Sequence, residues 1–389
     1  MGNFETVHER KNTRSVKWDL LHAVFQTEDV LPMWVADMDF KAPEEVNNAI
    51  IERAKHGIYG YTVLDEKVKQ SVVNWLSNRH NWDIEEKWLS FSPGVVTTLH
   101  MAVQALTEAG DKILIQTPVY TPFYQVIEKH DRQIVKNPLV QKDNYYHIDF
   151  QDFEEKLKTG VKAFILCSPH NPVGRVWTKE ELSEMARLCL KHDVLIFSDE
   201  IHADLIYSGH KHIPIASLST EIADKTITCM APSKTFNLAG LQASFAVTTN
   251  QEYRKSLNDM LGKQGHHMLN TMATTAIEAA YEHGEPWLNE LMSVLKDHHD
   301  YVVSELEGKT NLKVIRAEGT YLLWFDCSAL NMDPKELKQF MIEEAKVGLN
   351  AGIDYGDEGA SFMRMNIACP RETLEEGVQR IISAYQKLN

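Results

Sequence analysis

Short, almost wholly apolar runs alternate with amphipathic stretches through the middle of the chain. The runs lie at residues 112–116, 161–167, 194–198, 226–230 and 243–248. Helical periodicity marks residues 94–106 and 178–191, and Thr178 with Glu181 forms a capping-box pattern at the start of the second stretch. Apolar strands between amphipathic helices are typical of a sheet buried on both faces, so we predict an α/β fold with a mostly parallel sheet. Ligands bind such sheets at the carboxyl ends of the strands.

The two ends of the chain have a different pattern. We expect helices at residues 290–308, 334–345 and 371–388 and a strand at 320–326, a less regular mixture that indicates a smaller α+β domain. The N-terminal arm lacks clear periodicity until Pro43, which suits the first turn of a helix. We expect this arm to pack on the smaller domain and to line the site. We therefore predict a large domain at residues 46–285 and a small domain at residues 1–45 and 286–389.

Composition narrows the class of protein. The chain has 389 residues and a net charge of −15, which disfavours binding to nucleic acid and to anionic membranes. We find neither a basic start followed by an apolar stretch nor a run of about 18 apolar residues, so we expect no secretion signal and no membrane span. The 5 cysteines form no CxxC pair, and this odd, scattered set indicates reduced, buried thiols in a cytoplasm.

Lys234 follows the apolar run at residues 226–230 and is the most informative residue. A lysine at the mouth of a strand can be held partly out of water, which lowers its pKa and makes its amine a nucleophile. Such lysines form Schiff bases with carbonyls, including pyridoxal phosphate (PLP). Most lysines are solvated surface charges, so this segment alone does not decide between the two interpretations.

Asp199 and His202 follow the run at residues 194–198. A carboxylate directly after a buried strand needs a cationic or hydrogen-bonding partner, and a protonated pyridine nitrogen would serve. His202 could reach a phenolic oxygen of the same ring, although a structural histidine is the simpler interpretation. A metal site made of Asp199, His202 and Asp204 is also conceivable, but no second ligand cluster supports it.

Other unusual polar residues also follow predicted strands or start helices. Asn171 lies in a loop constrained by two prolines and a glycine, where it could donate a hydrogen bond to a ligand oxygen or simply form a turn. Gly94 opens a helix whose free N–H groups favour phosphate, and the ring of Tyr120 could stack on a heterocycle or belong to the core. Arg364, within an apolar segment, would hold either a ligand carboxylate or an internal salt bridge.

Taken together, these segments resemble the fold-type I PLP enzymes of the class I/II aminotransferase superfamily, and most of all the MalY/PatB-type cystathionine β-lyases (C–S lyases). The resemblance is carried by residues 31–40, 59–62, 166–177, 198–204, 231–241 and 318–326, in family order. It rests on the Asn-Pro-x-Gly motif at Asn171, the Asp-Glu-x-His motif at Asp199 and the Ser-Lys pair at Ser233. The segment at residues 36–40 points to the lyase group. The resemblance implies a seven-stranded sheet in a large PLP-binding domain.

The resemblance also implies roles for residues of this chain. Lys234 would carry PLP as a Schiff base and later move the substrate's Cα proton. The remaining cofactor contacts would come from Gly94, Val95, Val96, Tyr120, Asn171, Asp199, His202 and Ser233. Tyr61 would reach the phosphate of a neighbouring subunit, so the protein would be a homodimer with shared sites. Arg364 and Asn171 would hold the substrate carboxylate, and Trp34, Val35 and Ala36 would line the substrate side.

The sequence departs from the aminotransferase pattern at Gln242. Many of those enzymes have an arginine at this place, eight residues after the lysine, to neutralise the phosphate. The implied reaction is α,β-elimination of L-cystathionine, and of L-cysteine or L-cystine, to a thiol, pyruvate and ammonia. The alternatives are an aminotransferase that uses the same lysine and a regulatory protein that has lost catalysis. No metal is expected.

Overall fold

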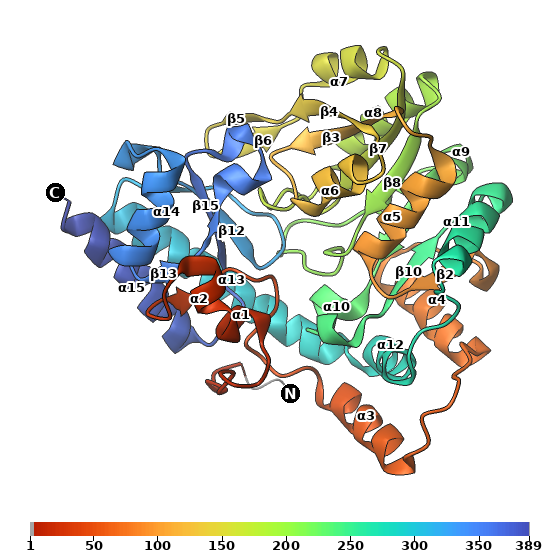
Figure 1. The fold of residues 1–389 in the computed structure, drawn as a ribbon, viewed down its shortest axis with the longest axis horizontal. Coiled ribbons are helices and arrows are strands. Elements are labelled where there is room, and N and C mark those ends of the chain that lie inside the picture. The colour runs from red at the N-terminus through yellow and green to blue at the C-terminus, as the bar shows by residue number, and fades with distance from the viewer. Residues whose placement is uncertain (1–3, 389) are drawn as a thin grey trace.

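The computed structural model describes residues 4–388, and its centre is a seven-stranded sheet (Figure 1). The strands lie in the order β2 (Leu89–Ser92), β10 (Ser244–Val247), β9 (Thr226–Met230), β8 (Leu195–Asp199), β7 (Val161–Cys167), β3 (Lys112–Thr117) and β4 (Gln133–Pro138). All are parallel except β10, which runs antiparallel to both of its neighbours. The predicted α/β fold with a mostly parallel sheet is confirmed. The prediction missed β2 and β4.

Helices cover both faces of this sheet (Figure 1). They are α5 (Val95–Leu106), α6 (Pro122–Glu128), α7 (Phe150–Leu157), α8 (Lys179–Lys191), α9 (Thr220–Asp224), α10 (Pro232–Thr235) and α11 (Gln251–Lys263). Successive strand residues serve opposite faces: Ile113 packs in the cluster that contains α5, whereas Leu114 packs in the cluster that contains α8. Thr178 and Glu181 form the expected capping box of α8. The two-sided burial explains why these strands are mostly apolar.

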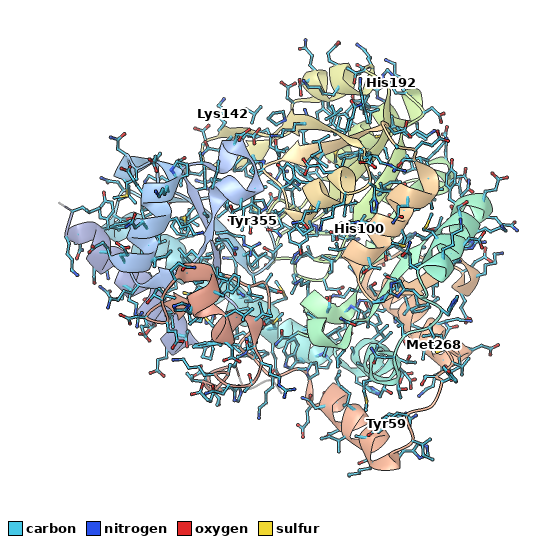
Figure 2. All side chains as sticks on the ribbon, in the orientation of Figure 1. Tyr59, His100, Lys142, His192, Met268 and Tyr355 are labelled. Carbon is cyan, nitrogen blue, oxygen red and sulfur yellow. The ribbon has the colours of Figure 1, made fainter. Side chains whose placement is uncertain are left out.

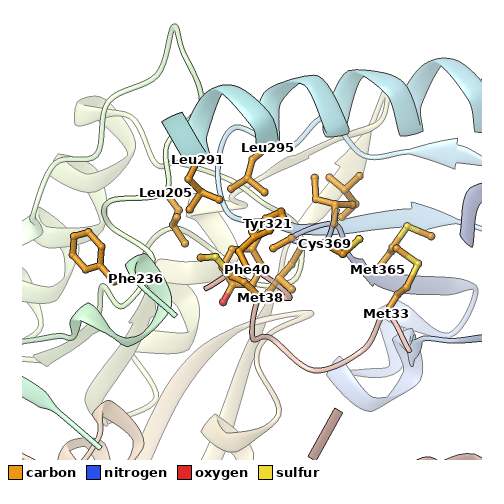
Figure 3. Close-up of a cluster of buried hydrophobic side chains, with 14 of the residues drawn as sticks. Met33, Met38, Phe40, Leu205, Phe236, Leu291, Leu295, Tyr321, Met365 and Cys369 are labelled. Atoms are coloured by element: carbon orange, nitrogen blue, oxygen red, sulfur yellow. The ribbon is translucent and has the colours of Figure 1, made fainter. Parts of the chain in front are cut away.

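The C-terminal part has its own antiparallel sheet. Its strands lie in the order β11 (Lys313–Val314), β12 (Leu322–Asp326), β15 (Phe362–Asn366) and β14 (Asn350–Ala351). Around it lie α13 (Glu285–Lys309), α14 (Pro334–Glu343) and α15 (Arg371–Gln386). This is the α+β mixture that the sequence predicted. Figure 3 shows α13 above a cluster of buried side chains. Phe236, which follows α10, and Met365 of β15 both belong to this cluster, so the two sheets share a core.

The N-terminal arm packs on the C-terminal part, as expected. Its elements are α1 (Val16–Asp19), α2 (Leu21–Phe25) and β1 (Leu31–Pro32), and β1 pairs in parallel with β13 (Val347–Gly348). Then α3 (Glu44–His56), α4 (Glu66–His80) and α12 (Thr271–His283) form a helical layer, and β5 (Val140–Lys142) with β6 (Tyr145–His147) forms a small hairpin. Pro43 is the N-cap of α3 rather than a residue of its first turn, because its ψ of 141° is extended.

Within residues 4–388, no helix combines the length and apolarity needed to cross a membrane. All 5 cysteines are free and buried, so they act as small core residues, as the sequence indicated.

A tight loop between β7 and α8 carries Asn171 against the C-terminal part. Gly174 has a φ of +73°, and its N–H donates to the carbonyl of His170 at 2.7 Å. The carbonyl of Gly174 accepts from the N–H of Glu318 at 2.8 Å, and the carboxylate of Glu318 pairs with the buried Arg175 at 2.9 Å. The loop is therefore fixed by contacts with a segment far away in the sequence.

Gly174→Ala is expected to lower the free energy of unfolding more than Gly160→Ala does. Both glycines have left-handed φ values, +73° and +87°, so either substitution carries strain of about 1–2 kcal/mol. Only at Gly174 would the new Cβ meet another atom, the Cβ of Ala317 at 2.7 Å. Urea unfolding of both variants checks this, and equal losses would contradict the role of the contact.

Candidate active site

A cavity of about 190 Å³ opens at the carboxyl ends of β7, β8 and β9, where the sequence predicted the site. Its lining includes many of the predicted residues: Ala36, Gly94, Val95, Val96, Tyr120, Asn171, Asp199, His202, Ser233 and Lys234. They come from the arm, from the ends of β2, β3, β8 and β9, and from the loop that follows β7. The fold therefore brings together side chains separated by up to two hundred residues.

Lys234 lies on α10, and its Nζ donates to the carbonyl of Ala36 at 2.7 Å. Burial and the positive charge of Arg364 lower the pKa of Lys234 to about 8, against the opposing charges of Asp37 and Asp199. At pH 7 the unprotonated amine, which is the form that acts as a nucleophile or base, is therefore roughly a hundredfold more abundant than at an ordinary lysine.

Asp199 ends β8, and one carboxylate oxygen accepts from the N–H of Ile201 at 3.1 Å. Within residues 4–388 it forms no ion pair. Burial raises the pKa of Asp199 to about 7, although Ile201 and Lys234 oppose this. A buried carboxylate in this state would gain from a cationic partner in the cavity.

Asp204 does not share a site with Asp199. Its carboxylate accepts from Thr235 at 2.8 Å, from the indole of Trp75 at 3.1 Å, and is bonded to His80 at 2.9 Å. These contacts occupy both carboxylate oxygens of Asp204, which does not line the cavity. Asp204 is therefore not placed to bind a metal ion together with Asp199 and His202. The structure instead leaves His202 at the cavity with a buried Nδ1 that has no partner among the described residues. Burial, together with the charges of Lys234 and Arg364, lowers the pKa of His202 to about 3, so its ring is neutral.

Arg364 lies on β15, buried beside Asn171, and it is not part of an internal salt bridge. Its guanidinium donates to Asn171 Oδ1 at 3.2 Å, Asn350 Oδ1 at 2.7 Å and the carbonyl of Trp34 at 2.8 Å. The Nε has no partner, and no carboxylate pairs with this arginine anywhere in residues 4–388. Its charge is therefore available to an anion that enters the cavity, so the salt-bridge interpretation is wrong.

The arm segment at residues 34–38 presents its backbone to the site. Asn366 Nδ2 donates to the carbonyls of Val35 at 2.6 Å and Asp37 at 2.5 Å. Asn237 bonds both the N–H and the carbonyl of Met38, each at 2.9 Å. Sequence reasoning missed Asn237, Asn350, Asn366 and Tyr321. Only Asn366 carried a signal, as a polar residue in the same apolar strand as Arg364.

Some residues that the sequence singled out do not line the cavity: Arg364, Trp34, Val35, Tyr61 and Gln242. Gln242 is exposed and has a φ of +56°, whereas Gly94, the N-terminus of α5 and Ser233 line the cavity. Tyr61, in the connection between α3 and α4, is 98% exposed. Figure 2 labels its neighbour Tyr59 far from Tyr355, whose ring contacts Arg364 at 5.2 Å. Within one chain, Tyr61 does not reach the site.

The family model for aminotransferase class I and II matches residues 28–381. The chain belongs to this family. It is 48% identical to cystathionine beta-lyase PatB of Bacillus subtilis over 98% of this chain and 99% of that protein. Among solved structures it is similar to cystalysin from Treponema denticola, which contains a pyridoxal 5′-phosphate cofactor, with a TM-score of 0.97, 38% identity and full coverage of both chains (100% each). It is also similar to the PLP-bound C-S lyase from Staphylococcus hominis, with a TM-score of 0.93, 35% identity and 98% coverage of each chain.

In the cofactor-free protein, Asp199→Asn is expected to raise the free energy of unfolding at about pH 8 but not at about pH 4. The pKa of Asp199 rises from 3.8 to about 7 on folding, so the wild-type protein loses stability as the pH increases through this range. Each unit of pKa shift corresponds to about 1.4 kcal/mol, and asparagine has no proton to lose. Urea unfolding at several pH values measures the difference. A gain that does not depend on pH would show that the carboxylate's ionisation is not the cause.

Proposed function

We propose that this protein is a PLP-dependent carbon–sulfur β-lyase that cleaves L-cystathionine, and L-cysteine or L-cystine, to a thiol, pyruvate and ammonia. The observation that carries the proposal is the full-length 48% identity to a cystathionine beta-lyase, combined with an amine, a carboxylate and a guanidinium that converge without ion-pair partners. When bound, PLP supplies an electron sink that stabilises negative charge at the substrate Cα.

The residues of the cavity fit PLP. Asp199 is a buried carboxylate without a cation, as a protonated pyridine nitrogen requires. The N-terminus of α5 follows Gly94 with N–H groups that face the cavity lining, which suits a phosphate. Tyr120 offers an aromatic face, the unpartnered Nδ1 of His202 offers a hydrogen bond, and Lys234 offers the amine that the cofactor's aldehyde needs.

Substrate binding depends on the cationic guanidinium of Arg364, and proton transfer depends on the unprotonated amine of Lys234. Arg364, with Asn171 beside it, binds the α-carboxylate and so fixes the orientation of the amino acid. Lys234, partly neutral because of its burial, removes the proton from Cα. Loss of the thiolate from Cβ then completes the elimination. Trp34 and Val35 precede Ala36, which lines the cavity, and we assign the substrate's side-chain region to this arm segment. The indole of Trp34 itself packs within the arm, where it donates to the Lys17 carbonyl at 3.0 Å and meets Phe25 edge to face.

We further propose that the protein acts as a cytoplasmic homodimer with shared sites. Tyr61 is 98% exposed, and the adjoining Ile58 and Val63 are 66% and 74% exposed. Apolar side chains this exposed on one connection are typical of a surface that another chain covers. A second copy placed there would bring Tyr61 to the phosphate side of its neighbour's cavity.

The reaction is tested by incubating the protein with PLP and L-cystathionine in the absence of any keto acid. We expect stoichiometric pyruvate, ammonia and free thiol, and we expect Lys234→Ala to reduce turnover by at least a thousandfold because it removes both the cofactor's anchor and the base. Product assays and single-time-point thiol titration measure this. Turnover only after a keto acid is added would instead establish an aminotransferase, and near-wild-type elimination by Lys234→Ala would disprove the assigned role of the lysine.

Shared sites predict complementation between two impaired variants. Lys234→Ala and Tyr61→Ala are each expected to have little activity at limiting PLP. In a hybrid dimer one site carries both substitutions and the other carries neither, so random reassociation restores about a quarter of the sites. Activity is measured after the two variants are mixed under mild dissociating conditions and returned to buffer. Activity that stays at the average of the two parents would mean that Tyr61 serves its own chain.

A further inference from the structure

The carbonyl of Ala36 accepts two hydrogen bonds from opposite parts of the molecule. Lys234 Nζ donates to it at 2.7 Å, and the hydroxyl of Tyr321 donates to it at 3.0 Å. Lys234 belongs to the large sheet's side, Tyr321 precedes β12 of the C-terminal sheet, and Ala36 belongs to the arm. A carbonyl has two lone pairs and can accept both donors at once.

Tyr321 is itself held firmly. Its side chain is 1% exposed and lies in the cluster with Met38 and Phe40, as Figure 3 shows. Its carbonyl accepts from the N–H of Ile367 at 2.9 Å, and its ring meets that of His202 edge to face at 6.1 Å. A hydroxyl on so rigid a ring fixes the position of the carbonyl that it binds.

The position of this carbonyl matters to the amine. A neutral amine has two N–H donors and one lone pair, so donating to Ala36 restricts rotation about the Cε–Nζ bond and fixes the direction of the lone pair. The neighbouring carbonyls of Val35 and Asp37 accept hydrogen bonds from Asn366. Tyr321 is the residue that holds the carbonyl of Ala36 between them. The hydroxyl of Tyr321 bonds the Ala36 carbonyl rather than the amine, and Tyr321 does not line the cavity.

We propose that Tyr321 is a positioning residue that, through the Ala36 carbonyl, orients Lys234 for removal of the substrate's Cα proton. The inference rests on the proposed role of Lys234 as the base. It extends that role to Tyr321, which acts on Lys234 only through the Ala36 carbonyl. The proton passes from the substrate Cα to Lys234 Nζ, and the two electrons of the C–H bond stay on the substrate. Tyr321 keeps its own proton throughout.

Exchange of the Cα hydrogen of L-alanine in D₂O tests this step, because alanine has no thiolate to lose. With PLP-loaded enzyme, we expect Tyr321→Phe to lower kcat for exchange about tenfold with KM changed less than twofold, the loss of one aligning hydrogen bond. Tyr207→Phe is the matched control. It removes the hydroxyl of another buried tyrosine, one that has no partner among the described residues, and should leave exchange unchanged. Cofactor affinity and unfolding midpoints of both variants show whether a loss reflects positioning or folding.

A second comparison separates action through the lysine from any other role. In Lys234→Ala protein, added methylamine serves as the base, and we expect Tyr321→Phe to lower this rescued exchange less than twofold. An equal tenfold loss in the rescued protein, or wild-type exchange by Tyr321→Phe, would overturn the inference while leaving the lyase proposal intact. Wild-type protein that eliminates thiol but shows no lysine-dependent exchange would overturn the role of Lys234 and the inference with it.

Discussion

The arm is anchored by a buried ion cluster. Lys17, 1% exposed, donates to Asp39 at 2.6 Å, and Arg10 pairs with Asp39 at 2.6 Å and with Asp37 at 2.8 Å. Burial alone would raise the pKa of Asp39, but Lys17, Trp18 and Arg10 together hold it below its usual value. Buried charges that are fully paired resist rearrangement, since breaking one pair strands the other charge. The carbonyls at residues 34–38 therefore stay fixed above the cavity.

At the cavity, by contrast, charged side chains are held without ion-pair partners. Asp199 and Arg364 are about as buried as Lys17 and Asp39, and Lys234 is half-buried, yet none of the three has an ion-pair partner among residues 4–388. The shifted pKa values of Lys234 and Asp199 record the free energy of keeping these two groups out of water without a counter-ion. A cofactor with a cationic ring nitrogen and an anionic phosphate, and a substrate with a carboxylate, supply the charges that are absent. The paired anchor and the unpaired site lie on the two sides of one short segment.

The sequence predicted those parts of the structure that depend on the burial pattern of a single segment. Strands buried on both faces are mostly apolar, so β3, β7, β8 and β9 were predictable, and the side chains at their carboxyl ends had to meet at one edge. The edge strand β4 and the outer strand β2 were missed because they are only partly buried and carry Gln133, Ser90 and Ser92. Local pattern left the partners of Arg364 open, because Trp34 and Asn171 lie 330 and 193 residues away, and only the family resemblance placed the three residues at one site. Backbone acceptors such as the Ala36 carbonyl leave no trace in the sequence.

The arm contributes hydrogen-bond acceptors to the site through its main chain. The hydrogen bonding of this segment is therefore separate from the identity of its side chains. Every residue type has a carbonyl, so the hydrogen bonds to Trp34, Val35 and Ala36 survive substitution at these positions as long as the backbone path is kept. The side chains of Val35 and Ala36 make none of these hydrogen bonds and can diverge, whereas the indole of Trp34 is held by the Lys17 carbonyl at 3.0 Å and by the ring of Phe25. Over evolutionary time, or in a directed library, this short stretch offers a place where substrate preference can drift without dismantling the catalytic geometry.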